Sequence, residues 1–204
     1  MDVGVVAVLR RAFRLWWDEW VVFLALNAAW FFLQLPVVTG PPATAALFAM
    51  VNESYGKVYW GPRDAWAAFR RLFWPAWRWG LPNLLVIAVA VFNFVAYGDT
   101  PGLNWRLLRL LWVVTLFALF GLNLLYWPFW LAQDDKRLRT TYANAARFFL
   151  LNPLPGLALA AFSLLLTLGS LILTLPFTLA LACWLACIAT VAVQHSLEQR
   201  HSHR

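Results

Sequence analysis

Apolar residues fill four long stretches of this chain that contain no Asp, Glu, Lys or Arg. The stretches cover residues 20–52, 79–98, 110–133 and 148–197. A bilayer core about 30 Å thick takes about 20 apolar helical residues to cross, so stretches of this kind are typical of transmembrane helices. Hydrocarbon offers the backbone no hydrogen-bond partner, which favours helix throughout. The pattern predicts an all-α, polytopic transmembrane helix bundle that forms one membrane domain over residues 1–204.

Glycine and proline divide these stretches into six predicted spans, arranged as three hairpins. The run Thr39-Gly40-Pro41-Pro42 ends one helix and starts the next, and Pro176 divides the last stretch. The predicted spans cover residues 20–38, 42–55, 81–97, 107–131, 154–175 and 176–195. The second span has only about 14 residues and would reach about 21 Å. It would therefore cross only with local thinning of the bilayer or shielding by neighbouring helices.

The Lys and Arg residues are unevenly divided between the two sides of the membrane that the predicted spans define. If the amino terminus lies inside, fourteen of the sixteen Lys and Arg residues face the cytoplasm, and only Arg106 and Arg109 face the other side. Lys and Arg concentrate on the cytoplasmic side of membrane proteins. The sequence thus predicts a multi-pass protein of the bacterial inner membrane with both termini in the cytoplasm. Topology also explains the net charge of +7, so nucleic acid is not predicted as a partner.

Three segments read as basic amphipathic helices that precede the three hairpins. They cover residues 3–19, 63–77 and 135–149. In the second segment, one face carries Trp66, Phe69, Phe73 and Trp77, and the other carries Arg63, Arg70 and Arg71. Such helices lie in the headgroup region, where anionic lipids attract the cations. Fourteen tryptophans, many of them near span ends, fit an aromatic belt better than a carbohydrate-stacking site.

A weak internal sequence repeat, or echo, suggests that the chain repeats a unit of one interfacial helix and one hairpin. The motif Ala-Phe-Arg at residues 12–14 precedes Asn27 at the same spacing as Ala-Phe-Arg at residues 68–70 precedes Asn83. The echo is open to two explanations, because common ancestry and shared interfacial physics predict the same pattern.

The spans contain uncharged polar residues but no carboxylate near a midplane. The candidates for a polar cavity are Asn27, Asn93, Asn123, Ser163 and Thr167. Such side chains commonly hydrogen-bond one helix to another, and a ligand-lined cavity is the alternative. Proton- and sodium-coupled carriers usually need an ionisable group within the membrane. An actively coupled carrier is therefore disfavoured, whereas a passive pathway stays open.

The corner between the first two spans is the strongest candidate for a role beyond packing. Its candidate residues for a ligand site or gate are Pro36, Thr39, Gly40, Pro41 and Pro42. Helices interrupted by Gly and Pro often expose backbone groups in a binding site. The plainer interpretation is a tight corner that needs Gly and Pro for its geometry.

Motifs for catalysis, metal or cofactor binding are not evident. Cys183 and Cys187 lie four residues apart on one helical face, but no His or carboxylate lies nearby in their span. A zinc site needs further ligands. The sequence also lacks a phosphate-binding glycine loop and a metalloprotease motif. We expect no catalytic residue, no metal and no cofactor.

Residues 27–48 read NAAWFFLQLPVVTGPPATAALF and resemble the YesL-like family of bacterial membrane proteins, a domain of unknown function. The aromatic and basic segment 64–73 and the pair Asn152-Pro153 are similar to that family as well. The resemblance implies a helical membrane protein, often found in the company of carbohydrate uptake and breakdown functions. It implies no catalytic residues.

These features lead to one functional expectation and one alternative. We expect a non-catalytic membrane protein that assists or regulates a solute uptake system, with carbohydrate as the solute that the resemblance implies. Its partner would be a transporter subunit or a second copy of the chain. The candidate residues for docking that partner or lipid headgroups are Arg70, Arg71, Arg137 and Arg139. The alternative is a stand-alone passive carrier or channel for a neutral small solute or a lipid.

Overall fold

The described part of the chain, residues 4–172 and 176–202, is helical apart from short connections in this computed structural model. The helices are α1 (Val5–Asp18), α2 (Trp20–Gln34), α3 (Gly40–Tyr55), α4 (Pro62–Tyr97), α5 (Leu103–Ala132), α6 (Leu138–Leu151), α7 (Pro153–Ile172) and α8 (Pro176–Ser202). Strands are absent from the described residues. The all-α prediction is confirmed.

Helix α3 lies at the centre of the protein. Twelve of its sixteen residues are buried, and α2, α4, α5 and α8 all contact it. Small side chains let helix backbones approach closely, and α3 carries four buried alanines: Ala43, Ala45, Ala46 and Ala49. The closest approach is to α4, where a Cβ on Gly80 would lie 2.8 Å from Cγ of Pro41. The short second span is thus shielded on most sides by protein.

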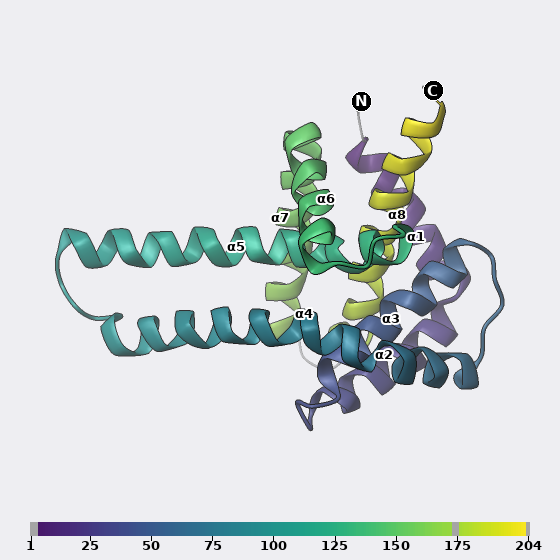
Figure 1. The fold of residues 1–204 in the computed structure, drawn as a ribbon, viewed down its shortest axis with the longest axis horizontal. Coiled ribbons are helices and arrows are strands. Elements are labelled where there is room, and N and C mark those ends of the chain that lie inside the picture. Colours follow the sequence, from purple (N-terminus) through teal and green to yellow (C-terminus); the bar gives the residue numbers. More distant parts are fainter. Residues whose placement is uncertain (1–3, 173–175, 203–204) are drawn as a thin grey trace.

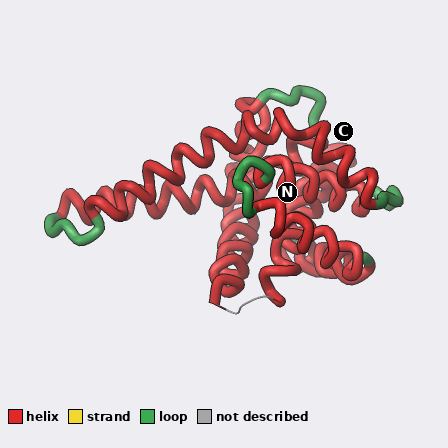
Figure 2. Tube along the Cα trace, turned by 90° about the horizontal axis from the view of Figure 1, so that it is seen from below, coloured by secondary structure: helices red, strands yellow, loops and turns green. Residues whose placement is uncertain are grey.

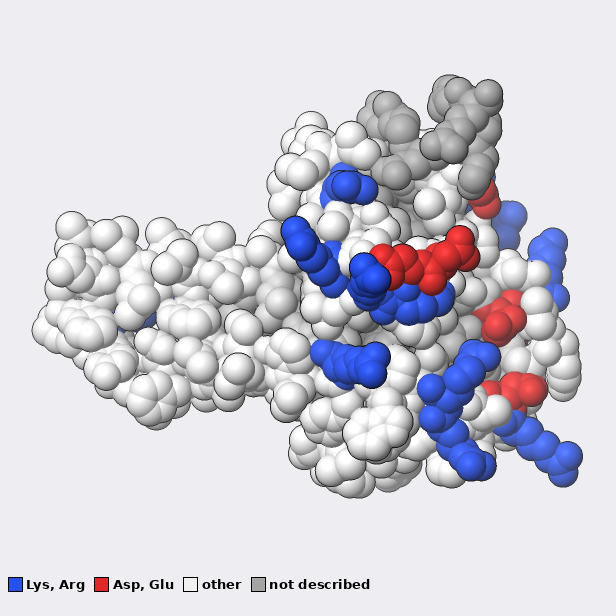
Figure 3. Space-filling view, viewed as in Figure 1, with Lys and Arg blue, Asp and Glu red and all other residues white. Residues whose placement is uncertain are grey.

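Helices α4 and α5 form a hairpin that extends away from the other helices (Figures 1 and 2). Bulky apolar side chains cover its outer part, and Val95 near the tip is 81% exposed. In Figure 3 the visible face of the hairpin is largely uncharged, whereas Lys and Arg gather over the opposite end of the molecule. The hairpin therefore presents an apolar surface that water would not favour.

Within the described residues, four helical segments are long and apolar enough to cross a membrane: Pro62–Tyr97, Leu103–Ala132, Pro153–Ser170 and Ala180–Gln199. Helix α2 is apolar but shorter. The chain thus has the helices that a multi-pass membrane protein requires. The six-span topology stays a prediction, and the turn expected between the last two spans falls at residues 173–175, outside the described residues.

The structure corrects the break expected between the interfacial segment 63–77 and the span 81–97. Both belong to one continuous helix, α4, which also contains Pro75 and Pro82. The reason is that the apolar face of the first half packs against α3, so that Phe69 and Leu72 are buried by protein. A helix held by such packing tolerates the hydrogen bond that each proline removes.

Candidate functional site

A cavity of about 620 Å³ lies between the α2–α3 corner, the inner halves of α4 and α5, and α7. Four side chains supply its polar groups: Gln34, Thr44, Asn83 and Asn123. The rest of the lining is mostly apolar, and none of the described residues that form it is charged. Small-molecule sites commonly have this volume and this combination of apolar walls with few polar groups.

A closed ring of three hydrogen bonds connects α4, α5 and α6 at one side of the cavity. Asn83 Nδ2 donates to the Tyr142 hydroxyl (2.9 Å), which donates to Asn123 Oδ1 (2.7 Å). Asn123 Nδ2 closes the ring by donating to Asn83 Oδ1 (2.6 Å). Hydrogen bonds in such chains polarise one another, and satisfied polar networks fix the arrangement of the groups around them. The ring therefore fixes the root of the hairpin.

Trp79 extends this ring. Its indole Nε1 donates to Asn123 Oδ1 (2.9 Å), and its backbone carbonyl accepts the second Asn83 hydrogen bond (2.7 Å). Burial raises the pKa of the Tyr142 phenol, so this hydroxyl stays protonated at neutral pH and remains a donor. All four residues are neutral, which suits a site surrounded by apolar helices.

A second polar group lies at the α2–α3 corner. Gln34 Nε2 donates to the carbonyl of Gly40 (3.3 Å) and to the Thr44 hydroxyl (3.4 Å), which also accepts from Trp30 Nε1 (3.0 Å). A Cβ on Gly40 would lie 2.6 Å from Gln34 Oε1. Glycine at this position leaves room for the end of the Gln34 side chain, and the positive φ of the corner (59°) belongs to Val37.

The first turn of α3 offers no backbone donor to a ligand. Pro41 and Pro42 have no N–H, while the N–H of Gly40 donates to Val37 and that of Ala43 to Thr39. Unsatisfied N–H groups at a helix start can bind anions, and here they are absent or used. The corner thus contributes to the cavity through its shape and side chains.

The cavity brings together three of the residues singled out in the sequence, Gly40, Pro41 and Asn123. The other corner residues do not line it. Pro36 is exposed, Pro42 is buried, and the Thr39 hydroxyl donates to the Leu33 carbonyl.

The remaining candidates for a polar cavity serve contacts within or between helices. Asn27 Oδ1 accepts the backbone N–H of Cys183 on α8 (3.0 Å). Asn93 Nδ2 donates to the Val89 carbonyl, one turn back on α4. The Thr167 hydroxyl donates to the carbonyl of the buried Ser163 on α7. Of these three contacts, that of Asn27 joins two helices, whereas those of Asn93 and Thr167 stay within α4 and α7.

Sequence reasoning did not place Trp79, Asn83 and Tyr142 at a site. Trp79 is one of the fourteen tryptophans attributed to an aromatic belt, and Tyr142 lies within the predicted interfacial segment 135–149. One signal did point to Asn83, because it repeats the position of Asn27 after an Ala-Phe-Arg motif. Both asparagines are buried and bonded to other helices.

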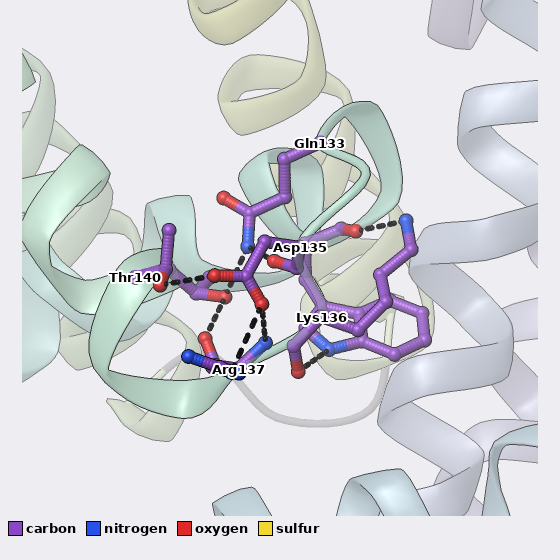
Figure 4. A network of polar contacts seen from close by, with 7 residues as sticks. Gln133, Asp135, Lys136, Arg137 and Thr140 are labelled. Carbon is purple, nitrogen blue, oxygen red and sulfur yellow. Dashed lines mark hydrogen bonds and ion pairs between the residues drawn. The ribbon is translucent and has the colours of Figure 1, made fainter.

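The α5–α6 connection holds a separate polar network (Figure 4). Asp135 accepts from the hydroxyl of Thr140 (2.7 Å) and the N–H of Arg137 (3.1 Å), and these two bonds, that of Thr140 above all, lower the pKa of its carboxyl. Lys136 Nζ lies 4.7 Å from the centre of the Trp130 ring and donates to the Trp130 carbonyl. The N-cap residue of α6 is Arg137. Lys136 also donates to the carbonyl of Leu131 and so satisfies the end of α5.

The candidate docking arginines lie on the surface. Arg70 and Arg71 are exposed on α4, where Arg71 lines a pocket together with Met50 and Glu53 of α3, and Arg139 is exposed on α6. The side chain of Arg137 is 86% exposed, although its Nε lies 3.7 Å from Asp135. These groups are free to contact headgroups or another protein.

Residues 23–94 match a family described as "Protein of unknown function, DUF624". No curated protein and no solved structure matches the chain. The matched segment covers most of α2, all of α3 and most of α4, and it includes residues 27–48, on which the resemblance to the YesL-like family rests. It contains the corner and Asn83 but not Asn123 or Tyr142.

Proposed function

We propose that this protein is a non-catalytic membrane protein that binds a neutral, largely apolar molecule in the cavity, as a passive carrier of a small solute or lipid would. The observation that carries the proposal is the 620 Å³ cavity with uncharged walls. A charged ligand would lose its hydration there without gaining a partner. The apolar helices around the cavity suit a ligand that enters from the bilayer.

A photoreactive fatty acid methyl ester in phosphatidylcholine vesicles tests this proposal. We expect it to label residues that line the cavity, with labelling sites mapped by mass spectrometry. Leu119→Trp should reduce that labelling several-fold, because the larger side chain fills part of the cavity. Leu110→Trp is the matched control, since Leu110 lies on the exposed outer part of α5. Labelling spread evenly over the hairpin, and unaffected by Leu119→Trp, would contradict the proposal.

A second candidate function is support or regulation of a solute uptake system. The exposed pair Arg70 and Arg71 favours it, because these cations are accessible on a helix that packs firmly against α3. Carbohydrate as the solute rests on the family resemblance alone. The partner in this case is a transporter subunit or a second copy of the chain.

Crosslinking in native membranes, followed by purification and mass spectrometry, tests the second candidate. Combined Arg70→Glu and Arg71→Glu should release a bound subunit while the protein stays in the membrane. Arg106→Glu, at the hairpin tip, is the control. Recovery of the same subunit with and without the charge reversal would count against docking at these arginines.

We further propose that the cation-rich end of the molecule faces the cytoplasm of a bacterial cell. The support is the charge distribution, with Arg106 and Arg109 as the cations of the hairpin tip. A single cysteine placed at Tyr59 or Asp99 should react with an impermeant thiol reagent from opposite sides of the membrane. Reaction of both from one side would reject the orientation.

A further inference from the structure

We infer that the polar end of the cavity recognises a hydroxyl group, so that the ligand is a neutral amphiphile with a hydroxyl-bearing headgroup. This inference rests on the proposed function and specifies the chemistry of the same site. Its basis is the hydrogen-bonding capacity that Asn83 and Asn123 retain after their contacts within the protein are counted.

The two amides have one unused donor and one unused acceptor between them. Asn83 uses both N–H groups, on Trp79 and Tyr142, and one acceptor position of its Oδ1, on Asn123. Asn123 uses both acceptor positions of its Oδ1, on Trp79 and Tyr142, but only one N–H. A side-chain amide has two donors and two acceptor positions. One N–H of Asn123 and one lone pair of Asn83 therefore remain.

These two unused groups lie on neighbouring atoms, because Asn123 Nδ2 and Asn83 Oδ1 are 2.6 Å apart. The second N–H of Asn123 points away from the N–H that donates to Asn83, so two ligand atoms are needed to bond to both groups. Hydroxyls on adjacent carbons can do so, because one oxygen accepts the Asn123 N–H and the other hydroxyl donates to Asn83 Oδ1, whereas an ester or ether oxygen only accepts and an ammonium group only donates. The pair thus favours hydroxyls over other polar groups of similar size.

Gln34 adds an acceptor at another wall of the cavity. Its Nε2 is engaged with Gly40 and Thr44, while its Oε1 has no hydrogen-bond partner among the described residues. A further hydroxyl of the ligand would satisfy this oxygen. With acceptors at two walls and one free donor, the cavity suits a headgroup with more than one hydroxyl.

The polar and apolar groups are arranged as an amphiphile requires. Asn83 is 7% exposed and lies at the floor with Gly80 and Pro41, which are also buried. Leu84 and Ile87, which also line the cavity, are 40% and 45% exposed. The headgroup would therefore lie at the floor, with the hydrocarbon tail directed past the apolar rim.

Two photoreactive probes with the same acyl chain test the inference, a monoacylglycerol with two free hydroxyls and the methyl ester used above. In phosphatidylcholine vesicles, the unaltered protein should prefer the monoacylglycerol by about tenfold, the effect of one or two hydrogen bonds to neutral groups. Asn123→Leu should abolish this preference, so that the two probes label equally. Labelling by the methyl ester should persist in this variant, which shows that the cavity is still formed. Asn93→Leu makes the same change outside the cavity and should leave the preference unaltered.

The possible results separate the inference from the proposed function. Equal labelling by both probes, reduced by Leu119→Trp, would overturn the inference and leave a neutral-ligand site. If neither probe labels the unaltered protein more strongly than it labels Leu119→Trp, both the inference and the proposed function would be overturned. If Asn123→Leu fails to fold, the probe preference of the unaltered protein still decides, because that comparison needs no variant.

Discussion

Most of helix α3 and the outer part of α4 lie in charge-free stretches of the sequence, residues 20–52 and 79–98, but they occupy opposite environments. Helix α3 buries twelve of sixteen residues in protein, whereas most of the outer hairpin is exposed. Apolarity alone therefore does not tell a helix that faces lipid from a helix that faces protein.

Side-chain size makes the distinction. The buried face of α3 is rich in alanine and begins with Gly40, so neighbouring backbones approach closely. The outer hairpin carries Leu, Val, Ile and Phe, which extend outward. Lipid tails are as apolar as these side chains, so association of helices in a membrane depends on packing more than on hydrophobicity. The comparison predicts that size changes matter on α3 and are tolerated on the hairpin.

Enlarging a buried alanine on α3 should have the largest effect. Ala45 is completely buried, and Ala45→Leu should lower the free energy of unfolding by about 3 kcal/mol through overpacking. Denaturant titration in detergent micelles, monitored by circular dichroism, measures this change. The same substitution at the exposed Ala88 should change stability by less than about 0.5 kcal/mol. Equal losses at both positions would mean that burial does not distinguish the two regions.

The contact between α3 and α4 should be nearly as sensitive. Gly80→Ala places a Cβ 2.8 Å from the Pro41 ring, which forces the helices apart and should cost about 2 kcal/mol. Gly169→Ala on α7 is the control, because a Cβ there meets nothing within 4 Å. It should stabilise the helix by about 0.5 kcal/mol. The two variants should therefore shift the unfolding midpoint in opposite directions.

Much of the architecture followed from the sequence, because length, charge-free stretches and helix breakers are local properties. They predicted the all-α fold. The continuity of α4 could not be predicted in this way, since it depends on α3 covering Phe69 and Leu72. Amphipathic patterning gives a helix an apolar face but does not say whether lipid or protein covers it.

The candidate site was predictable only in part, for a similar reason. Asn123 and Gly40 were visible as a polar residue in a span and a glycine at a corner. The partners of Asn123 are 40 and 19 residues away in the sequence, and a ring that joins three helices leaves no local pattern. Tyr142 in particular looked like one more aromatic residue at an interface.

Breaking the hydrogen-bonded ring should affect stability less than overpacking α3. Tyr142→Phe removes the hydroxyl that bridges Asn83 and Asn123, and should lower the free energy of unfolding by about 1 kcal/mol. Tyr59→Phe is the control, because Tyr59 is 96% exposed. If both variants unfold at the same denaturant concentration, the ring does not stabilise the root of the hairpin.

The tip of the hairpin provides the smallest predicted effect. Arg109 donates to the carbonyls of Tyr97, Gly98 and Thr100 (3.1, 2.8 and 3.2 Å) and so satisfies the end of α4. Arg109→Ala should speed amide hydrogen exchange around residues 97–105 about fivefold, which corresponds to about 1 kcal/mol of local opening. Global stability should stay within about 0.5 kcal/mol, since the tip is far from α3.

Arg106→Ala is the matched control, because Arg106 is exposed and has no hydrogen bond from its side chain among the described residues. Faster exchange in Arg109→Ala alone would show that Arg109 is held at the tip by the backbone it caps. Local structure would then explain why Arg109, one of the two arginines predicted to lie on the side opposite the cytoplasm, is found there. Equal exchange in both variants would instead mean that the carbonyls at the tip are satisfied without Arg109, and that its position needs another cause.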